Sequence, residues 1–239
     1  MIRITELPLP LEHGADALRQ AILRRLSIKP DELLDYTLFK RSYDARRKNQ
    51  IHFVCIVDVS VRDDAAVLRR FAGDRHVSSA PDTSYHPVAS APPALAERPL
   101  VVGFGPAGLF AALLLAQMGF RPIVLERGRE VRRRTQDTWA LWRQKILTPE
   151  SNVQFGEGGA GLFSDGKLYS QIKDPRFLGR KVMQEFVRAG APPEILYVSK
   201  PHIGTFRLVS MVERIRIVRC IGGMIAAVAA PAGGGGGRR

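Results

Sequence analysis

The segment from Arg98 to Gly128, RPLVVGFGPAGLFAALLLAQMGFRPIVLERG, constrains the fold more than any other part of this 239-residue chain. A strand-like run from Leu100 to Gly103 leads directly into a glycine-rich turn, and the apolar residues from Pro106 to Met118 then predict a buried helix. A second apolar run, from Pro122 to Leu125, ends at Glu126. Strand, glycine turn, helix and strand in this order predict a parallel βαβ unit.

The glycine turn follows the G-x-G-x-x-G pattern of dinucleotide-binding proteins. Gly103 permits the tight turn, Gly105 lets the backbone approach a pyrophosphate, and Gly108 allows the helix to pack closely on the strand. The helix N-terminus directs free N–H groups and a partial positive charge toward that phosphate. Glu126 lies eighteen positions after Gly108, close to the spacing of the acid that binds a ribose hydroxyl, which favours FAD or NAD over NADP. A glycine turn in an unrelated α/β unit is the alternative interpretation.

A second glycine cluster lies in the string NVQFGEGGAGLFSDGKL, which runs from Asn152 to Leu168. Glycines at this density let the main chain pass close to a flat or charged ligand, and consecutive N–H groups can form an anion-binding nest. A flexible surface loop is the alternative. The glycines of the cluster are Gly156, Gly158, Gly159 and Gly161.

Together with GFGPAGLFAALLLAQMG and VLERG, this string resembles the bacterial FAD-dependent dehydrogenases that are relatives of the glutathione-reductase-type flavoproteins. The resemblance covers about residues 1–213, including the segment KRSYDAR at Lys40–Arg46, and GEGGAG-L-FSDGKL is its most specific part. It implies an α/β chain with an incomplete Rossmann-type (βαβ) FAD-binding domain, preceded by a small α+β domain. The implied activity is that of an FAD-dependent oxidoreductase.

The resemblance also implies roles for individual residues. Glu126 would bind the adenosine ribose, Arg127 would lie beside the adenine, and Arg134 would contact phosphate or ribose. The pyrophosphate of FAD would be held by the residues of the first glycine turn, which are Gly103, Gly105, Pro106, Ala107 and Gly108.

The remaining roles concern the flavin end of the cofactor. The cluster from Gly156 to Gly161 would line the flavin side of the site. Lys167 is a candidate to lie near the isoalloxazine ring, where a cation stabilises reduced anionic flavin, and an ordinary solvent-facing lysine is the alternative. The sequence identifies neither a catalytic residue nor the small-molecule substrate, and NAD(P)H is an electron donor that such a protein could use.

Four segments differ in composition. Residues 1–72 predict a small α+β domain, with strands over 2–6, 35–42 and 51–61 and helices over 15–26, from Lys29 onward, and over 65–72. Residues 73–98 are rich in Ser, Ala and Pro and predict an extended linker. Residues 99–214 contain the predicted FAD-binding domain. Residues 215–239 carry no acid, end in five glycines and two arginines, and predict a low-complexity, disordered tail.

Charge and composition narrow the classes of function. The net charge of +13 falls mainly after residue 98, but no recognition motif accompanies it, so nucleic acid is not favoured as a partner. No apolar run reaches the roughly 20 residues that a bilayer-spanning helix needs, so we expect no membrane association. Cys55 and Cys220 lie far apart and the histidines show no metal spacing, which favours no metal site and a cytoplasmic location. We expect Cys55 in the core, and Trp139 and Trp142 packed against the sheet.

Flavoproteins of this type are much longer than this chain, and the similarity ends abruptly after the segment from Met211 to Arg216. We therefore expect a truncated or frameshifted product in which FAD affinity could be low and catalysis absent. Two alternatives to a flavin-dependent oxidoreductase stay open. One is a non-catalytic nucleotide- or RNA-binding protein that uses the basic turn from Tyr43 to Asn49, and the other uses NAD directly at the glycine turn without flavin.

Overall fold

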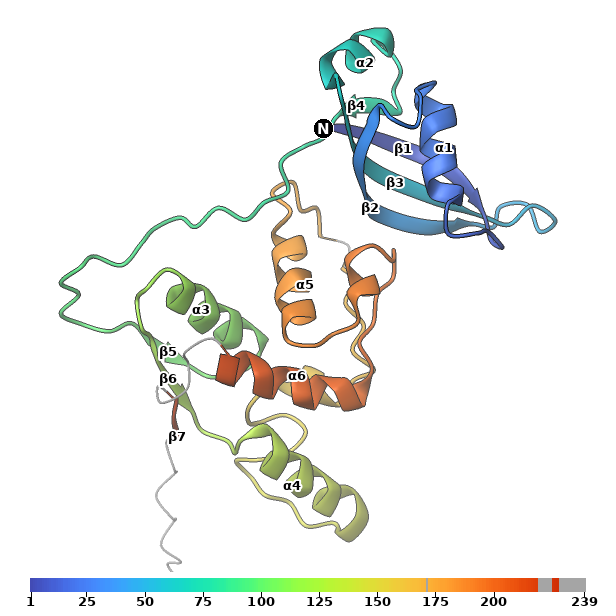
Figure 1. Ribbon diagram of the computed structural model, residues 1–239. Helices are drawn as coiled ribbons and strands as arrows, with labels where there is room; N and C mark the ends of the chain where they lie inside the picture. The colour runs from blue at the N-terminus through green and yellow to red at the C-terminus, as the bar shows by residue number, and fades with distance from the viewer. Residues whose placement is uncertain (171, 219–224, 228–239) are drawn as a thin grey trace, which may run out of the picture. The chain divides into compact units, whose positions relative to one another are not determined.

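The computed structural model describes residues 1–170, 172–218 and 225–227 (Figure 1). The chain forms two compact units. The N-terminal unit comprises Met1–Ser84 together with Glu194–Pro201, and the second unit comprises the other described residues from Tyr85 onward. Both contain strands and helices, so the predicted mixed α/β class is confirmed.

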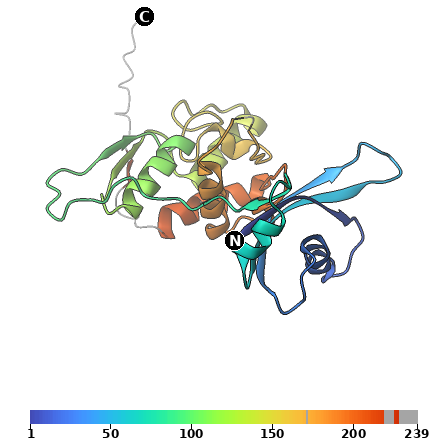
Figure 2. The same ribbon diagram turned by 90° about the horizontal axis from the view of Figure 1, so that it is seen from above.

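The N-terminal unit has the element order β1 (Ile2–Pro10), α1 (Ala17–Leu26), β2 (Leu33–Asp44), β3 (His52–Val61), α2 (Asp64–Arg70) and β4 (Val77–Ser79). Its strands are antiparallel in the order β2-β3-β1-β4. This is the split-βαβ topology of ferredoxin-like domains, in which each helix connects two strands that flank a third. The turn between β2 and β3 stands at the end of a long hairpin (Figures 1 and 2).

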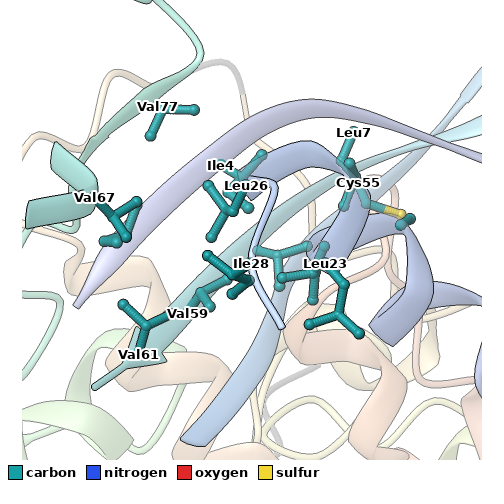
Figure 3. Close-up of a cluster of buried hydrophobic side chains, with 14 of the residues drawn as sticks. Ile4, Leu7, Leu23, Leu26, Ile28, Cys55, Val59, Val61, Val67 and Val77 are labelled. Carbon is teal, nitrogen blue, oxygen red and sulfur yellow. The ribbon is translucent and has the colours of Figure 1, made fainter. Parts of the chain in front are cut away.

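Alternating burial along the strands builds the core of this unit. In β3 every second side chain, from Phe53 to Val61, is buried, because successive residues of a strand point to opposite faces of the sheet. Leu23 and Leu26 of α1 and Val67 of α2 cover the same face, and Figure 3 shows them meeting the strand residues. Cys55 is fully buried in this cluster, as predicted.

The segment from Lys29 to Glu32 forms a single turn, so the helix predicted there was wrong. The Glu32 N–H donates to the Lys29 carbonyl at 3.1 Å, and the Glu32 carboxylate accepts the Lys29 N–H at 2.6 Å. Leu33 then begins β2, because pairing with β3 along the full hairpin outweighs the local helix signal. A second difference is β4, which lies within the range 73–98 predicted as a linker.

Asp63 and Asp64 both precede an apolar helical run, and the sequence predicts that they cap it; only Asp63 does so, because Asp64 is the first residue of α2 and its carboxylate accepts the Val61 N–H at 2.9 Å. The Asp63 side chain caps the helix by accepting the Ala66 N–H at 2.8 Å.

On the other face of the sheet, Arg3 of β1 and Asp58 of β3 form two hydrogen bonds of 2.6 and 2.7 Å. Both side chains are largely buried, so this pair contributes a desolvated ion pair to the sheet.

The second unit is built on the parallel strands β5 (Leu100–Val102), β6 (Ile123–Glu126) and β7 (Ile225–Ala227), in the order β5-β6-β7. Helix α3 (Pro106–Gln117) connects β5 to β6, so the predicted strand–helix–strand order is confirmed. The remaining elements are α4 (Val131–Gln144), the 3-10 turn η1 (Ala160–Phe163), α5 (Leu178–Arg188) and α6 (Thr205–Val218). A further 3-10 turn, η2 (Pro193–Leu196), lies where the chain passes between the two units.

The predicted tail 215–239 is described in part. Residues 215–218 complete α6, and Ile225–Ala227 form β7 beside β6. The other residues of this range, including Cys220, lie outside the described residues, and so does the disorder predicted for them. Within the described residues, none of the helices has the length and apolar character to cross a bilayer.

A buried carboxylate joins α5 to α3. Glu185 accepts hydrogen bonds from Lys181 at 2.7 Å, Gln117 at 3.1 Å and Arg188 at 2.6 Å, and it is 3% exposed. Burial by itself would raise the pKa of Glu185, but the hydrogen bonds from Lys181 and Gln117 outweigh it and hold that pKa below its ordinary value. The contact therefore depends on an ionised Glu185.

Candidate functional site

The first glycine turn has the backbone geometry that the sequence predicts. Gly103 has φ +90°, a conformation that favours glycine, and Gly105 is the N-cap of α3. A Cβ on Gly108 would lie 1.9 Å from the Gly103 carbonyl oxygen. The tight turn at Gly103 and the close packing at Gly108 are therefore confirmed. Pro106 and Ala107 occupy the first turn of α3, where N–H groups have no acceptor within the helix.

The second glycine cluster packs directly against this turn. The Gly158 N–H donates to the Phe104 carbonyl at 2.9 Å. A Cβ on Gly159, which has φ +65°, would lie 2.8 Å from Pro106 Cδ and 3.2 Å from Gly105 Cα. The two clusters, separated by some fifty residues of sequence, thus form one surface of bare backbone.

A groove of about 620 Å³ opens along that surface, a size typical of small-molecule sites. One wall is the end of β5 and the glycine turn, at Val102, Gly103 and Gly105. A second wall is residues 125–127 at the end of β6, and a third is formed by residues 154–156 with Gly159. The groove therefore lies at the carboxyl ends of parallel strands, where open α/β sheets bind ligands.

Glu126 lies in the groove and also holds the turn together. Its Oε2 accepts the Phe104 N–H at 2.7 Å, and its Oε1 accepts the Gly128 N–H at 2.8 Å. Each carboxylate oxygen can accept a second hydrogen bond, so the group retains acceptor capacity for the hydroxyls of a ligand. The predicted contact with a ribose is compatible with this placement.

The far end of the groove carries an aromatic ring and a guanidinium group. Arg127 is paired with Glu150, and its guanidinium carbon lies 5.2 Å from the centre of the Phe155 ring. Phe155 is 44% exposed and lines the groove beside Gln154. Our sequence reasoning did not identify Phe155 or Gln154, although an aromatic residue directly before the glycine cluster was a usable signal.

Arg134 lies behind the second glycine cluster, and its predicted contact with phosphate or ribose is not what the structure shows. Its side chain is fully buried and donates to five backbone carbonyls between residues 152 and 159 at 2.7–3.3 Å. Burial lowers the pKa of Arg134 to about 10, against the opposing charges of Glu126 and Glu157. Arg134 therefore shapes the loop from inside, because the carbonyls of a glycine-rich loop need donors once they are buried.

Glu157 is a second buried charge that sequence reasoning missed. It is 3% exposed, and its Oε2 accepts the Val131 N–H at the start of α4 at 2.6 Å and pairs with Arg216 at 3.2 Å. Burial raises the pKa of Glu157, although the bond from Val131 and the charge of Arg216 act in the opposite direction. Glu157 thereby ties the second glycine cluster to α4 and α6.

Lys167 and Gly161, both predicted at the cofactor, do not line the groove, and neither does Gly158. Lys167 is exposed and pairs with Asp165 at 3.1 Å, and Gly161 has no atom within 4 Å of a Cβ placed on it.

The prediction that the tryptophans pack against the sheet was wrong. The ring centres of Trp139 and Trp142 lie 5.8 Å apart, the Trp142 ring also lies 5.8 Å from the Phe163 ring, and the two tryptophans are 42% and 54% exposed.

Comparisons with known proteins leave the activity open. A family model described as a domain of unknown function (DUF8436) matches residues 1–60. An uncharacterised protein from Clostridium beijerinckii is 43% identical over 215 residues, which is 90% of this chain and 40% of that protein. The chain thus spans about two fifths of the length of the curated relative it matches. Within the described residues, no group of three or more His, Cys, Asp or Glu side chains is placed to hold a metal ion.

Proposed function

We propose that the groove binds the adenosine diphosphate end of FAD, and that the chain is part of a cytoplasmic FAD-dependent oxidoreductase with a Rossmann-type domain. The observation that carries the proposal is the convergence of the glycine turn, the N-terminus of α3 and Glu126 on one groove. The parallel order β5-β6-β7 around α3 supports the Rossmann-type assignment. Flavin, when bound, supplies the capacity to accept a hydride or electrons from a small-molecule substrate or from NAD(P)H.

The residues present fit such a cofactor. The groove is lined by bare backbone at Gly103, Gly105, Gly156 and Gly159, and a Cβ on Gly159 would collide with Pro106 Cδ at 2.8 Å, so this close approach of the two loops requires glycine. The first-turn amides of α3 would face the pyrophosphate, because Pro106 at the helix start leaves Ala107 and Gly108 as the available donors. The N–H groups of Ala107 and Gly108 would therefore bind the phosphate, with no side chain involved.

Ribose recognition would fall to Glu126. Its two oxygens already hold the Phe104 and Gly128 amides, so the carboxylate is fixed before any ligand arrives. A phosphate on the adenosine ribose would place like charges together, so we expect FAD or NAD to be preferred over NADP. Arg127 and Phe155 would flank the adenine.

An RNA-binding function has less support. In the basic turn after β2, the Arg46 guanidinium is bound to the Asp44 carboxylate through contacts of 2.5–3.1 Å. The bond from Arg46 holds the pKa of Asp44 well below its usual range, so the pair stays charged and mutually neutralised. One of the cations required for phosphate contacts is thus occupied.

The test is a titration of the purified chain with FAD, read from flavin fluorescence and visible absorption. We expect saturable binding that ADP-ribose displaces and FMN does not, because the groove takes the adenosine end. Glu126→Ala should weaken FAD binding at least about tenfold, the size expected for losing a charged hydrogen-bonding partner. Glu97→Ala, at an exposed acid of the same unit, is the matched control and should bind as the wild type does. Failure of both FAD and ADP-ribose to bind would overturn the proposal.

A further inference from the structure

The N-terminal unit carries a second groove, of about 440 Å³, on the face of its sheet opposite the hydrophobic core. Val54 and Ile56 of β3 line it, and they alternate with the buried residues Phe53, Cys55 and Val57 that face α1. The floor of the groove is therefore apolar although it lies on the solvent side of the sheet. We name it the open-face groove. It is separate from the FAD proposal and does not depend on it.

Cationic and hydroxyl groups surround this apolar floor. Lys40 of β2 and Arg75, which precedes β4, line the groove together with Thr5 and Ser42. Lys40 is exposed and forms no ion pair with any described residue. Arg75 uses Nε for its bond to His76 at 2.8 Å, which leaves its two terminal nitrogens available to a ligand. Two cations with free donors thus face a single small space.

The imidazole of His76 is oriented by its neighbours. Because the Arg75 Nε can only donate, His76 Nε2 must accept, and His76 Nδ1 then donates to Thr5 Oγ1 at 3.0 Å. These bonds hold the Arg75 side chain at the rim of the groove. His76 is therefore a positioning residue for Arg75.

The backbone at the edge of the groove is strained. The register of β1 shifts between Ile4 and Leu7, and Glu6 within this bulge has φ +54°, a conformation that favours glycine. A bulge of this kind re-aims side chains and is common beside functional sites, where residues in sparsely populated backbone conformations also cluster. Here it brings the Glu6 carboxylate to 3.7 Å from His76 Nε2, at the mouth of the groove.

We propose that the open-face groove binds a small organic anion, whose carboxylate or phosphate group pairs with Lys40 and Arg75 and whose apolar part lies on Val54 and Ile56. The volume fits a molecule of small-metabolite size. The two cations outnumber the one carboxylate, Glu6, so the groove attracts negative charge. The apolar floor favours a ligand with a hydrocarbon part over a bare inorganic ion.

The experiment is an NMR titration of the full-length, ¹⁵N-labelled chain with four probes. Benzoate and phenyl phosphate carry both an anion and a ring, inorganic phosphate carries only the anion, and benzyl alcohol carries only the ring. We expect shifts at the amides of Thr5, Lys40 and Ile56, with at least one ring-bearing anion binding several-fold more tightly than inorganic phosphate and benzyl alcohol. Comparison of benzoate with phenyl phosphate then distinguishes a carboxylate ligand from a phosphate ester.

Three variants make the test specific. Lys40→Ala should weaken binding of the better probe about fivefold, whereas Lys48→Ala, at an exposed lysine in the β2–β3 turn, should leave it unchanged. Glu6→Gln removes the competing negative charge and should tighten binding about twofold. The proposal is overturned if benzyl alcohol binds as well as the anions, if Lys40→Ala binds like the wild type, if the shifts map elsewhere, or if no probe saturates below about 10 mM.

Discussion

Replacing Gly108 by alanine tests whether close packing of α3 on the glycine turn builds the groove. An ideal Cβ at this position lies 1.9 Å from the Gly103 carbonyl oxygen, whereas such contacts are essentially never shorter than 3.0 Å. Helix and turn must therefore separate by about 1 Å. Overpacking of this kind costs about 1–3 kcal/mol, and the better helix propensity of alanine returns up to about 1 kcal/mol. We expect a net destabilisation of the second unit by about 1–2 kcal/mol.

The assay is urea unfolding followed by tryptophan fluorescence. The chain has two tryptophans, Trp139 and Trp142, and both lie in α4, so the signal reports the second unit alone. The unfolding midpoint of Gly108→Ala should fall by about 0.5–1 M urea relative to the wild type. Gly161→Ala is the matched control, because a Cβ there meets no atom within 4 Å and stability should change by less than about 0.5 kcal/mol. Equal midpoints for Gly108→Ala and the wild type would refute the packing argument.

Three further predictions concern buried charges. Arg134→Met leaves several buried carbonyls without donors, so it should lower the free energy of unfolding of the second unit by about 3 kcal/mol or more in the same urea assay. Arg133→Met, on the exposed face of α4, is the control and should lower it by less than about 0.5 kcal/mol. Similar losses in the two variants would contradict the role of Arg134. Asp58→Ala leaves the buried Arg3 guanidinium without its partner and should therefore destabilise the N-terminal unit by about 2–3 kcal/mol. Because this unit has no tryptophan, its unfolding is followed by tyrosine fluorescence, and an unchanged stability would show that the pair is unimportant. Because the folded-state pKa of Glu185 is depressed, its contribution is present above its unfolded value of about 4.5 and is lost as the pH falls through the folded value. Glu185→Gln should therefore make the stability of the second unit less sensitive to acid as the pH falls below about 4.5, and an unchanged pH profile would exclude this linkage.

Much of the framework was predictable from local pattern. The alternation of β3, the strand–helix–strand order around α3 and the cap at Asp63 all follow from interactions within a few residues of sequence. The special conformation of Gly103 was predictable for the same reason, since a turn from strand into helix at that point has few backbone solutions. These features need no knowledge of distant partners.

Other features depended on residues far apart in the chain. The segment after Lys29 carries helix-start signals, yet pairing with β3 makes the residues that follow a strand. Arg134 carries a guanidinium group, which commonly binds phosphate, but a loop some twenty residues later folds around this side chain and buries its charge. Lys167 follows the glycine cluster in sequence but pairs with Asp165 outside the groove.

A glycine turn without side chains at the start of α3, followed by an acid at the end of the next strand, can be predicted from the residue order alone. The packing of Gly159 on Gly105, the entry of Phe155 into the groove and the burial of Arg134 behind it are visible only in the folded chain. The two groups of features differ in the range of the interactions that produce them. Backbone conformation is set by neighbouring residues, whereas burial and the pairing of a charge are set by whichever segments the folded chain brings into contact.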